Sequence, residues 1–245
     1  VDYFQGFCDL MIPMTIVFMS SRIGFSWEDP ESIERVRTVE SNVWTNLEAD
    51  LFWCMSRFIT LERFIYSEPA LREGEFVQHL ECLTAMADEP LRAHLAATGI
   101  DFLFFAYRWY VCLLHRELPV RHVFRLWDVH LALAESTPRF HSHVCAAFLS
   151  LLEPKLKVVP EFEGCLKLLH NPPVAEWGKG DVRALVQRAV ASVRRETEYF
   201  ANLSVLLYLY MTFLAAMVRT LLTMAVLFHW YGRTKTGLLN RGKPS

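Results

Sequence analysis

Side chains with nucleophile or metal-ligand chemistry are thinly spread along this sequence. The six cysteines are widely separated and none forms a C-x-x-C pair: Cys8, Cys54, Cys82, Cys112, Cys145 and Cys165. Most lie in apolar runs, which is typical of small buried side chains in a reducing compartment. His141 and His143 could form a metal pair, but no cysteine or acidic residue stands nearby at ligand spacing. The sequence therefore predicts no metal and no cofactor, and it places the histidine pair at a solvated helix start.

A polar block at the head of the chain is more distinctive. Its pattern is Y-x-Q-G-x-x-D-L-x-x-P, made by Tyr3, Gln5, Gly6, Asp9, Leu10 and Pro13. An amide such as that of Gln5 is a weak signal by itself, whereas the whole block is specific. Further segments stand downstream: Glu48-Ala49-Asp50 with Phe52-Trp53-Cys54, then Arg116-Glu117-Leu118-Pro119, then Arg125-Leu126-Trp127-Asp128.

Together these segments resemble the TBC family of Rab GTPase-activating domains, over roughly residues 1–173. Such activating proteins supply an arginine that stabilises developing phosphate charge and a glutamine that orients the attacking water. The resemblance implies Gln5 as the glutamine finger. It also implies a Rab-type GTPase as partner, with Tyr3, Gly6, Asp9 and Asp50 as contact candidates. Arg108, Trp127 and Asp128 are expected to be packing and ion-pair residues of the fold.

The arginine motif of the family, I-x-x-D-x-x-R-T, does not occur in this sequence. Val36-Arg37-Thr38 lies downstream of Gln5 and lacks the aspartate three residues before the arginine. Loss of an arginine finger removes about 10³–10⁵ in rate. Two expectations follow: the arginine lies in further N-terminal chain, or the domain is degenerate and Gln5 is vestigial.

The hydrophobic pattern predicts an all-α fold, because no useful stretch alternates with the period of a strand. A loop is expected over residues 24–33, which carry Pro30 and several acids. Helices are expected over residues 7–20 with a bend at Pro13, 48–65, 75–87, 91–98, 101–115, 120–134, 141–152, 162–170 and 181–198.

Residues 199–231 differ from the rest, because Arg219 is their only charged residue. About 20 apolar residues cross a bilayer, so the stretch predicts a transmembrane helix, with Trp230 at its interfacial end. The alternative is a buried C-terminal helix of a soluble domain. Arg219 is costly at bilayer depth and would suit contact with an integral membrane partner. The predicted organisation is a partial TBC-like domain (1–173), a linker and polar helix (174–198), the span (199–231) and a basic tail (232–245).

Charge is divided along the chain. Residues 1–178 carry 15 basic and 24 acidic side chains, a net charge of −9, whereas residues 179–245 carry 10 basic and 3 acidic, a net charge of +7. This division argues against nucleic-acid binding and favours attachment to a lipid bilayer, at an endomembrane or the mitochondrial inner membrane. The favoured function is a membrane-anchored, non-catalytic scaffold or accessory subunit. The alternatives are a fragment of an active Rab GTPase-activating protein and a Rab-binding effector.

Overall fold

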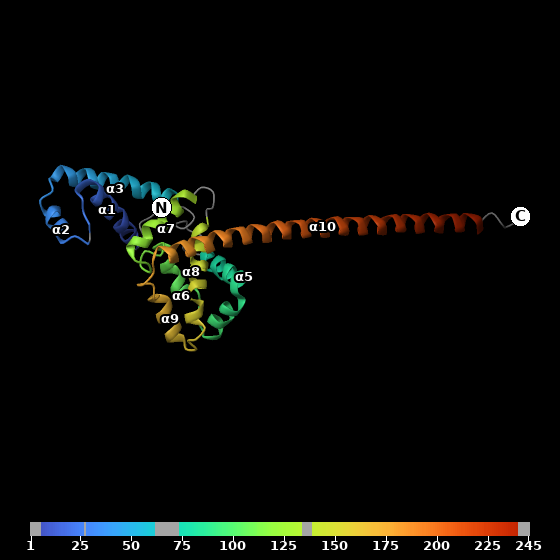
Figure 1. Ribbon diagram of the computed structural model, residues 1–245. Helices are drawn as coiled ribbons and strands as arrows, with labels where there is room; N and C mark the ends of the chain where they lie inside the picture. Colours follow the sequence, from blue (N-terminus) through green and yellow to red (C-terminus); the bar gives the residue numbers. More distant parts are fainter. Residues whose placement is uncertain (1–5, 27, 62–73, 134–138, 240–245) are drawn as a thin grey trace, which may run out of the picture. The chain divides into compact units, whose positions relative to one another are not determined.

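The computed structural model describes residues 6–26, 28–61, 74–133 and 139–239, and of residues 215, 216 and 218–239 it describes the backbone alone. The described residues form helices and no strand (Figure 1), which confirms the all-α fold. The helices are α1 (Phe7–Ile23), α2 (Pro30–Arg37), α3 (Ser41–Leu61), α5 (Glu75–Ala97), α6 (Leu103–Val111), α7 (Val120–Leu133), α8 (Phe140–Leu156), α9 (Phe162–His170) and α10 (Lys179–Leu239). The chain divides into two compact units, Val1–Arg194 and Arg195–Ser245.

Local sequence explains where the first two helices begin and end. Helix α1 is one helix that includes Pro13, and it ends at Gly24, whose φ of 64° is the left-handed C-cap conformation. The predicted loop over residues 24–33 is too long, because α2 begins inside it at Pro30. Asp29 caps α2 by accepting a hydrogen bond from the Glu31 amide at 3.0 Å. A proline directly after an N-cap starts a helix instead of breaking it.

Helix α5 joins two segments that the sequence predicts as separate helices. The backbone of Asp88 is not helical (φ −156°, ψ 81°), so the break before Pro90 is real and takes the form of a kink. The Asp88 carboxylate accepts a hydrogen bond from the Leu91 amide at 2.9 Å and thereby caps the second segment.

Helix α8 lies at the centre of the first unit and packs against α5, α6 and α7. Every residue from Phe140 to Leu149 is buried. Trp109 of α6 lies between two phenylalanine rings, with centroids 4.8 Å from Phe105 and 4.9 Å from Phe148. Burying such side chains contributes about 1.5–3 kcal/mol each to folding, so α6 and α8 anchor the core.

The solvated position expected for His141 and His143 is wrong, because each is only 1% exposed. His141 is held by the core: its Nε2–H donates to the Trp109 carbonyl at 2.9 Å, and its Nδ1 lies 3.2 Å from His130 Nε2. The cysteine expectation holds in part. All six thiols are free, and Cys112, Cys145 and Cys165 are buried, but Cys8 and Cys82 are exposed.

The C-terminal stretch is helical, as expected, but it continues the polar helix before it as part of α10. The transmembrane helix predicted over residues 199–231 is not found: no helix of the described residues has the length and apolar character needed to cross a membrane. The side chains of Arg219 and Trp230 lie outside the described residues.

Candidate functional site

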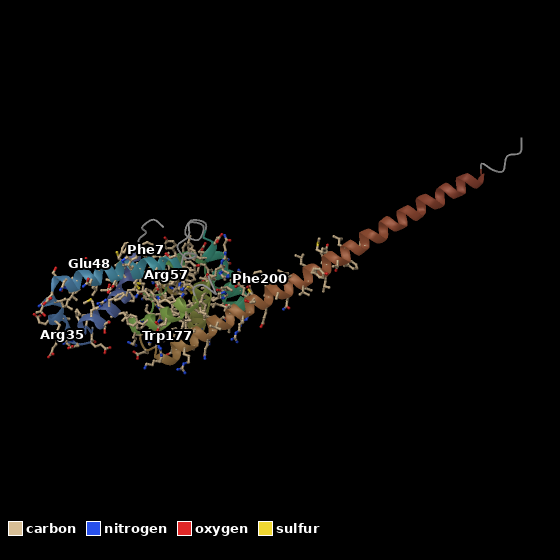
Figure 2. The ribbon with its side chains drawn as sticks, turned by 90° about the horizontal axis from the view of Figure 1, so that it is seen from above. Phe7, Arg35, Glu48, Arg57, Trp177 and Phe200 are labelled. Carbon is tan, nitrogen blue, oxygen red and sulfur yellow. The ribbon has the colours of Figure 1, made fainter. Side chains whose placement is uncertain are left out.

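Two of the predicted site residues, Gly6 and Asp9, lie at the start of α1. Tyr3 and Gln5 lie outside the described residues, so the glutamine-finger assignment stays a prediction. Gly6 is the N-cap of α1, with a φ of 127° that suits glycine, and Asp9 lies in the first turn. Figure 2 labels Phe7, the first residue of this helix. An acidic residue in the first turn is stabilised by the helix dipole.

Two side chains from the segment after α6 contact Asp9. The Cys112 thiol lies 3.8 Å from Asp9 Oδ2 and points its S–H toward it, and Arg116 Nε lies 3.7 Å from the same oxygen. The Arg116 side chain is 54% exposed, so its guanidinium remains accessible to a partner. The start of α1 is thus joined to a cation that follows it by more than a hundred residues.

An unusual turn presents Arg116. Leu113 and Leu114 both have left-handed backbones, with φ of 48° and 57°, and both side chains are fully buried. This conformation costs a non-glycine residue about 1–2 kcal/mol, so packing must hold it in place. The Trp127 indole N–H donates to the Leu113 carbonyl at 3.2 Å. Such strain is common where a fold positions functional groups.

An ion pair between the partly exposed Arg108 and the buried Glu117 adjoins the same turn. Arg108 Nε donates to Glu117 Oε1 at 2.6 Å, and the Arg108 guanidinium also donates to the His170 carbonyl at 2.5 Å. This confirms Arg108 as an ion-pair residue of the fold, and Trp127 is buried as expected. Burial raises the pKa of the Glu117 carboxyl, and the charge of Arg108 opposes that shift.

The site lacks an activated nucleophile in its described part. Burial, together with the charge of Asp9, raises the pKa of the Cys112 thiol to about 12, so the thiol stays protonated at neutral pH. Burial lowers the pKa of His115 although Asp9 opposes the shift, so this imidazole is neutral. The arrangement offers a cation and hydrogen-bonding groups, which suit recognition of a partner.

Asp50 does not join this cluster. It forms an ion pair with Arg22 at 2.5 Å, and Arg22 lies in the last turn of α1. Asp9 and Arg22 are 13 residues apart on one helix, which corresponds to roughly 20 Å at ~1.5 Å per residue. If both aspartates contact a GTPase, they touch different parts of it.

The sequence alone does not pair Arg116 or Cys112 with Asp9. The segment Arg116-Glu117-Leu118-Pro119 is recognisable as a block, but no local pattern relates residues so far apart. Their association depends on the turn at Leu113 and Leu114, and nothing in a pair of leucines signals a left-handed backbone.

Comparison with known proteins agrees with this architecture. The Rab-GTPase-TBC domain family matches residues 1–157. The chain belongs to this family. It is 36% identical over 190 residues to the GTPase-activating protein gyp1 of Schizosaccharomyces pombe, covering 76% of this chain and 36% of that protein. It is 34% identical over 189 residues to human TBC1 domain family member 22B, with the same coverage of 76% and 36%. The chain thus spans about a third of the length of these relatives.

A solved TBC structure has the same fold. The crystal structure of the Ypt/Rab-GAP domain of Gyp1p matches with a TM-score of 0.66 and 30% sequence identity, covering 80% of this chain and 60% of that one. The TBC-like helical fold expected from the motifs is therefore confirmed, and the segments that carry the resemblance lie in the matched part.

Proposed function

We propose that this TBC chain takes part in activating GTP hydrolysis by a Rab-type GTPase, with Gln5 as the glutamine finger. The observation that carries the proposal is the family match over residues 1–157, which begins with the Tyr3–Gln5 motif. Matched relatives are named as GTPase-activating proteins. The carboxamide of Gln5 would orient the water that attacks the γ-phosphate.

The geometry after Gln5 is consistent with this role. Gly6, the residue that follows Gln5 in the sequence, is the N-cap of α1, and Asp9 in the first turn contacts Cys112 and Arg116. A fixed first turn lowers the entropy that the finger must lose when the GTPase binds. Tyr3, Gly6, Asp9 and Asp50 are the proposed contacts, of which Asp9 and Asp50 would engage separate surfaces.

The test measures GTP hydrolysis by a panel of purified Rab proteins with the full native protein. Gln5→Ala is expected to reduce the stimulated rate by about 10²–10³, the usual effect of removing one group that acts on the transition state. Gln78→Ala is the matched control, because Gln78 lies exposed on α5. Equal stimulation by the Gln5 and Gln78 variants would contradict the assignment.

A second candidate is a non-catalytic accessory subunit that associates with integral membrane proteins. Exposed aromatic side chains on α3 favour it: Phe52 is 61% exposed and Trp53 is 71% exposed. Large exposed aromatic groups often mark contacts with proteins or membranes. This candidate predicts no stimulation of any Rab protein. It also predicts co-fractionation with an endomembrane or the mitochondrial inner membrane that is lost in a Phe52→Ser, Trp53→Ser variant.

A further inference from the structure

A groove of about 800 Å³ lies in the first unit, between α7 and the start of α10. Its lining includes no residue of α1, the helix that follows Gln5. Figure 2 labels Trp177, which lies in the segment leading into α10 and forms part of the groove. One wall is formed by residues between Arg121 and Val129 on α7, and the other by residues between Trp177 and Gln187.

Hydrogen bonds fix one wall of the groove to the other. His122 Nε2 donates to the Trp177 carbonyl at 2.7 Å, and the Arg121 guanidinium donates to the carbonyls of Ala175 and Trp177 at 3.4 and 3.3 Å. The Gly178 amide donates to the Asp181 carboxylate at 2.8 Å, which closes the first turn of α10. The groove is therefore formed before any ligand arrives, and a ligand need not order it.

The groove is cationic on an otherwise acidic body. Four basic side chains line it, those of Arg121, Arg125, Lys179 and Arg183, against the single carboxylate of Asp128. Arg125, Lys179 and Arg183 are exposed, and none of them forms an ion pair with any residue that the structure describes. A cleft lined by one sign of charge concentrates ligands of the opposite sign.

The floor of the groove is apolar, so a purely ionic ligand would leave it uncovered. Phe124, Val129, Val182 and Val186 line the groove together with the cations. A polyphosphate head group would gain nothing from these side chains, and Asp128 would repel it. A peptide offers carboxylates to the arginines, apolar side chains to the floor, and backbone N–H groups to Asp128 and Gln187.

We propose that this groove binds an acidic, amphipathic peptide segment of a partner protein. Charge complementarity selects the acidic character, and the apolar floor selects side chains such as leucine or phenylalanine at helical spacing. None of the residues proposed to contact the GTPase lines the groove, so it would give the domain a binding site for a second partner.

The test is a selection from a library of random 16-residue peptides displayed on phage, with the full chain immobilised. The Arg125→Glu, Arg183→Glu double variant serves as the counter-selection target; both side chains are exposed, so the fold should survive. Enriched sequences should contain several acidic residues together with apolar residues three or four positions apart. The best sequence, made as a fluorescent peptide, should bind the double variant at least about tenfold more weakly.

The Lys155→Glu, Lys167→Glu double variant is the matched control for the change in net charge, because both lysines are exposed and neither lines the groove. It should change the affinity of the peptide by less than about twofold, and the affinity should fall as salt rises from 50 to 500 mM. The proposal would be overturned if the enriched peptides were neutral or basic. It would also be overturned if no peptide bound the wild-type chain in preference to the groove double variant. Equal losses of affinity in the control and groove double variants would overturn it as well. So would tighter groove-dependent binding to vesicles containing phosphatidylinositol bisphosphate than to any peptide.

Discussion

Two imidazoles, those of His130 and His141, share a hydrogen bond inside the core. His141 Nε2–H donates to the Trp109 carbonyl, which leaves Nδ1 as an acceptor for His130 Nε2–H. The arrangement needs the His141 ring neutral, because a proton on His141 Nδ1 would place two donors face to face. Burial lowers the pKa of His141 to about 4 and also lowers the pKa of His130.

These shifts predict a pH-dependent stability. A histidine whose folded pKa lies below its unfolded value of 6.5 contributes stability above pH 6.5, and that contribution is lost as the pH falls toward 4. For His141 the loss is roughly 3 kcal/mol over this range, at ~1.4 kcal/mol per pKa unit. Urea unfolding of the chain should give a free energy of unfolding that decreases from pH 7 to pH 6 and again to pH 5.

His141→Gln removes the titrating group at this position and can keep its hydrogen bonds, since glutamine can donate to the Trp109 carbonyl and accept from His130. The variant should show a flatter dependence of the unfolding free energy on pH than the wild type. His170→Gln is the control, because the His170 imidazole hydrogen-bonds the Phe104 carbonyl at 3.0 Å and does not belong to the buried histidine pair. A wild-type slope in the His141 variant would contradict the prediction.

At the scale of elements, the helices were largely predictable, and their junctions were less so. The pattern from Phe162 to His170 predicts α9 with both of its ends, because Asn171 and two prolines follow it. The loop predicted over residues 24–33 is too long because it treats Pro30 as a helix breaker. Proline breaks a helix in its middle but favours one at its start, and Pro30 is the first residue of α2. The predicted solvation of the His141 segment is wrong. Polar residues at a helix start suggest exposure, whereas α8 packs against α5, α6 and α7.

Asp88 is the residue on which the kink of α5 depends. Asp88→Ala removes the cap of the second segment and should lower the free energy of unfolding by about 1 kcal/mol. Asp88→Asn keeps the side-chain oxygen that accepts from the Leu91 amide and loses only the ion pair with Lys157 at 3.4 Å, so it should cost less than half as much. Urea unfolding at low salt compares the two, since urea does not screen the ion pair. Equal losses would show that the ion pair is what matters.

At the scale of the whole molecule, the first unit is expected to fold without the second. The buried core residues among those described reach no further than Ala189, and the unit ends at Arg194. A chain that stops after Arg194 should therefore keep its melting temperature to within about 4 °C, which corresponds to about 1 kcal/mol. Circular dichroism during heating measures this.

Two comparisons make that prediction sharper. A chain that stops after Asn171 loses Val174, Val182 and Leu185 from the core and should melt far lower or not fold. The full chain keeps exposed apolar residues between Tyr199 and Leu214 and should self-associate or bind detergent, unlike the shorter chain ending at Arg194. Loss of cooperative melting in that shorter chain would refute the independence of the first unit.

The left-handed pair Leu113 and Leu114 makes the site at Asp9 a reporter of core integrity. The backbone of this pair is held against strain by complete burial, by the Trp127 indole and by backbone hydrogen bonds such as that from the Leu114 amide to the Trp109 carbonyl at 3.0 Å. A core that loosens therefore weakens the packing that holds the turn. Arg116 and Cys112 would then leave Asp9 while most helices remained formed. A partner that recognises this surface would distinguish well-packed copies of the domain from damaged ones before any helix has unfolded.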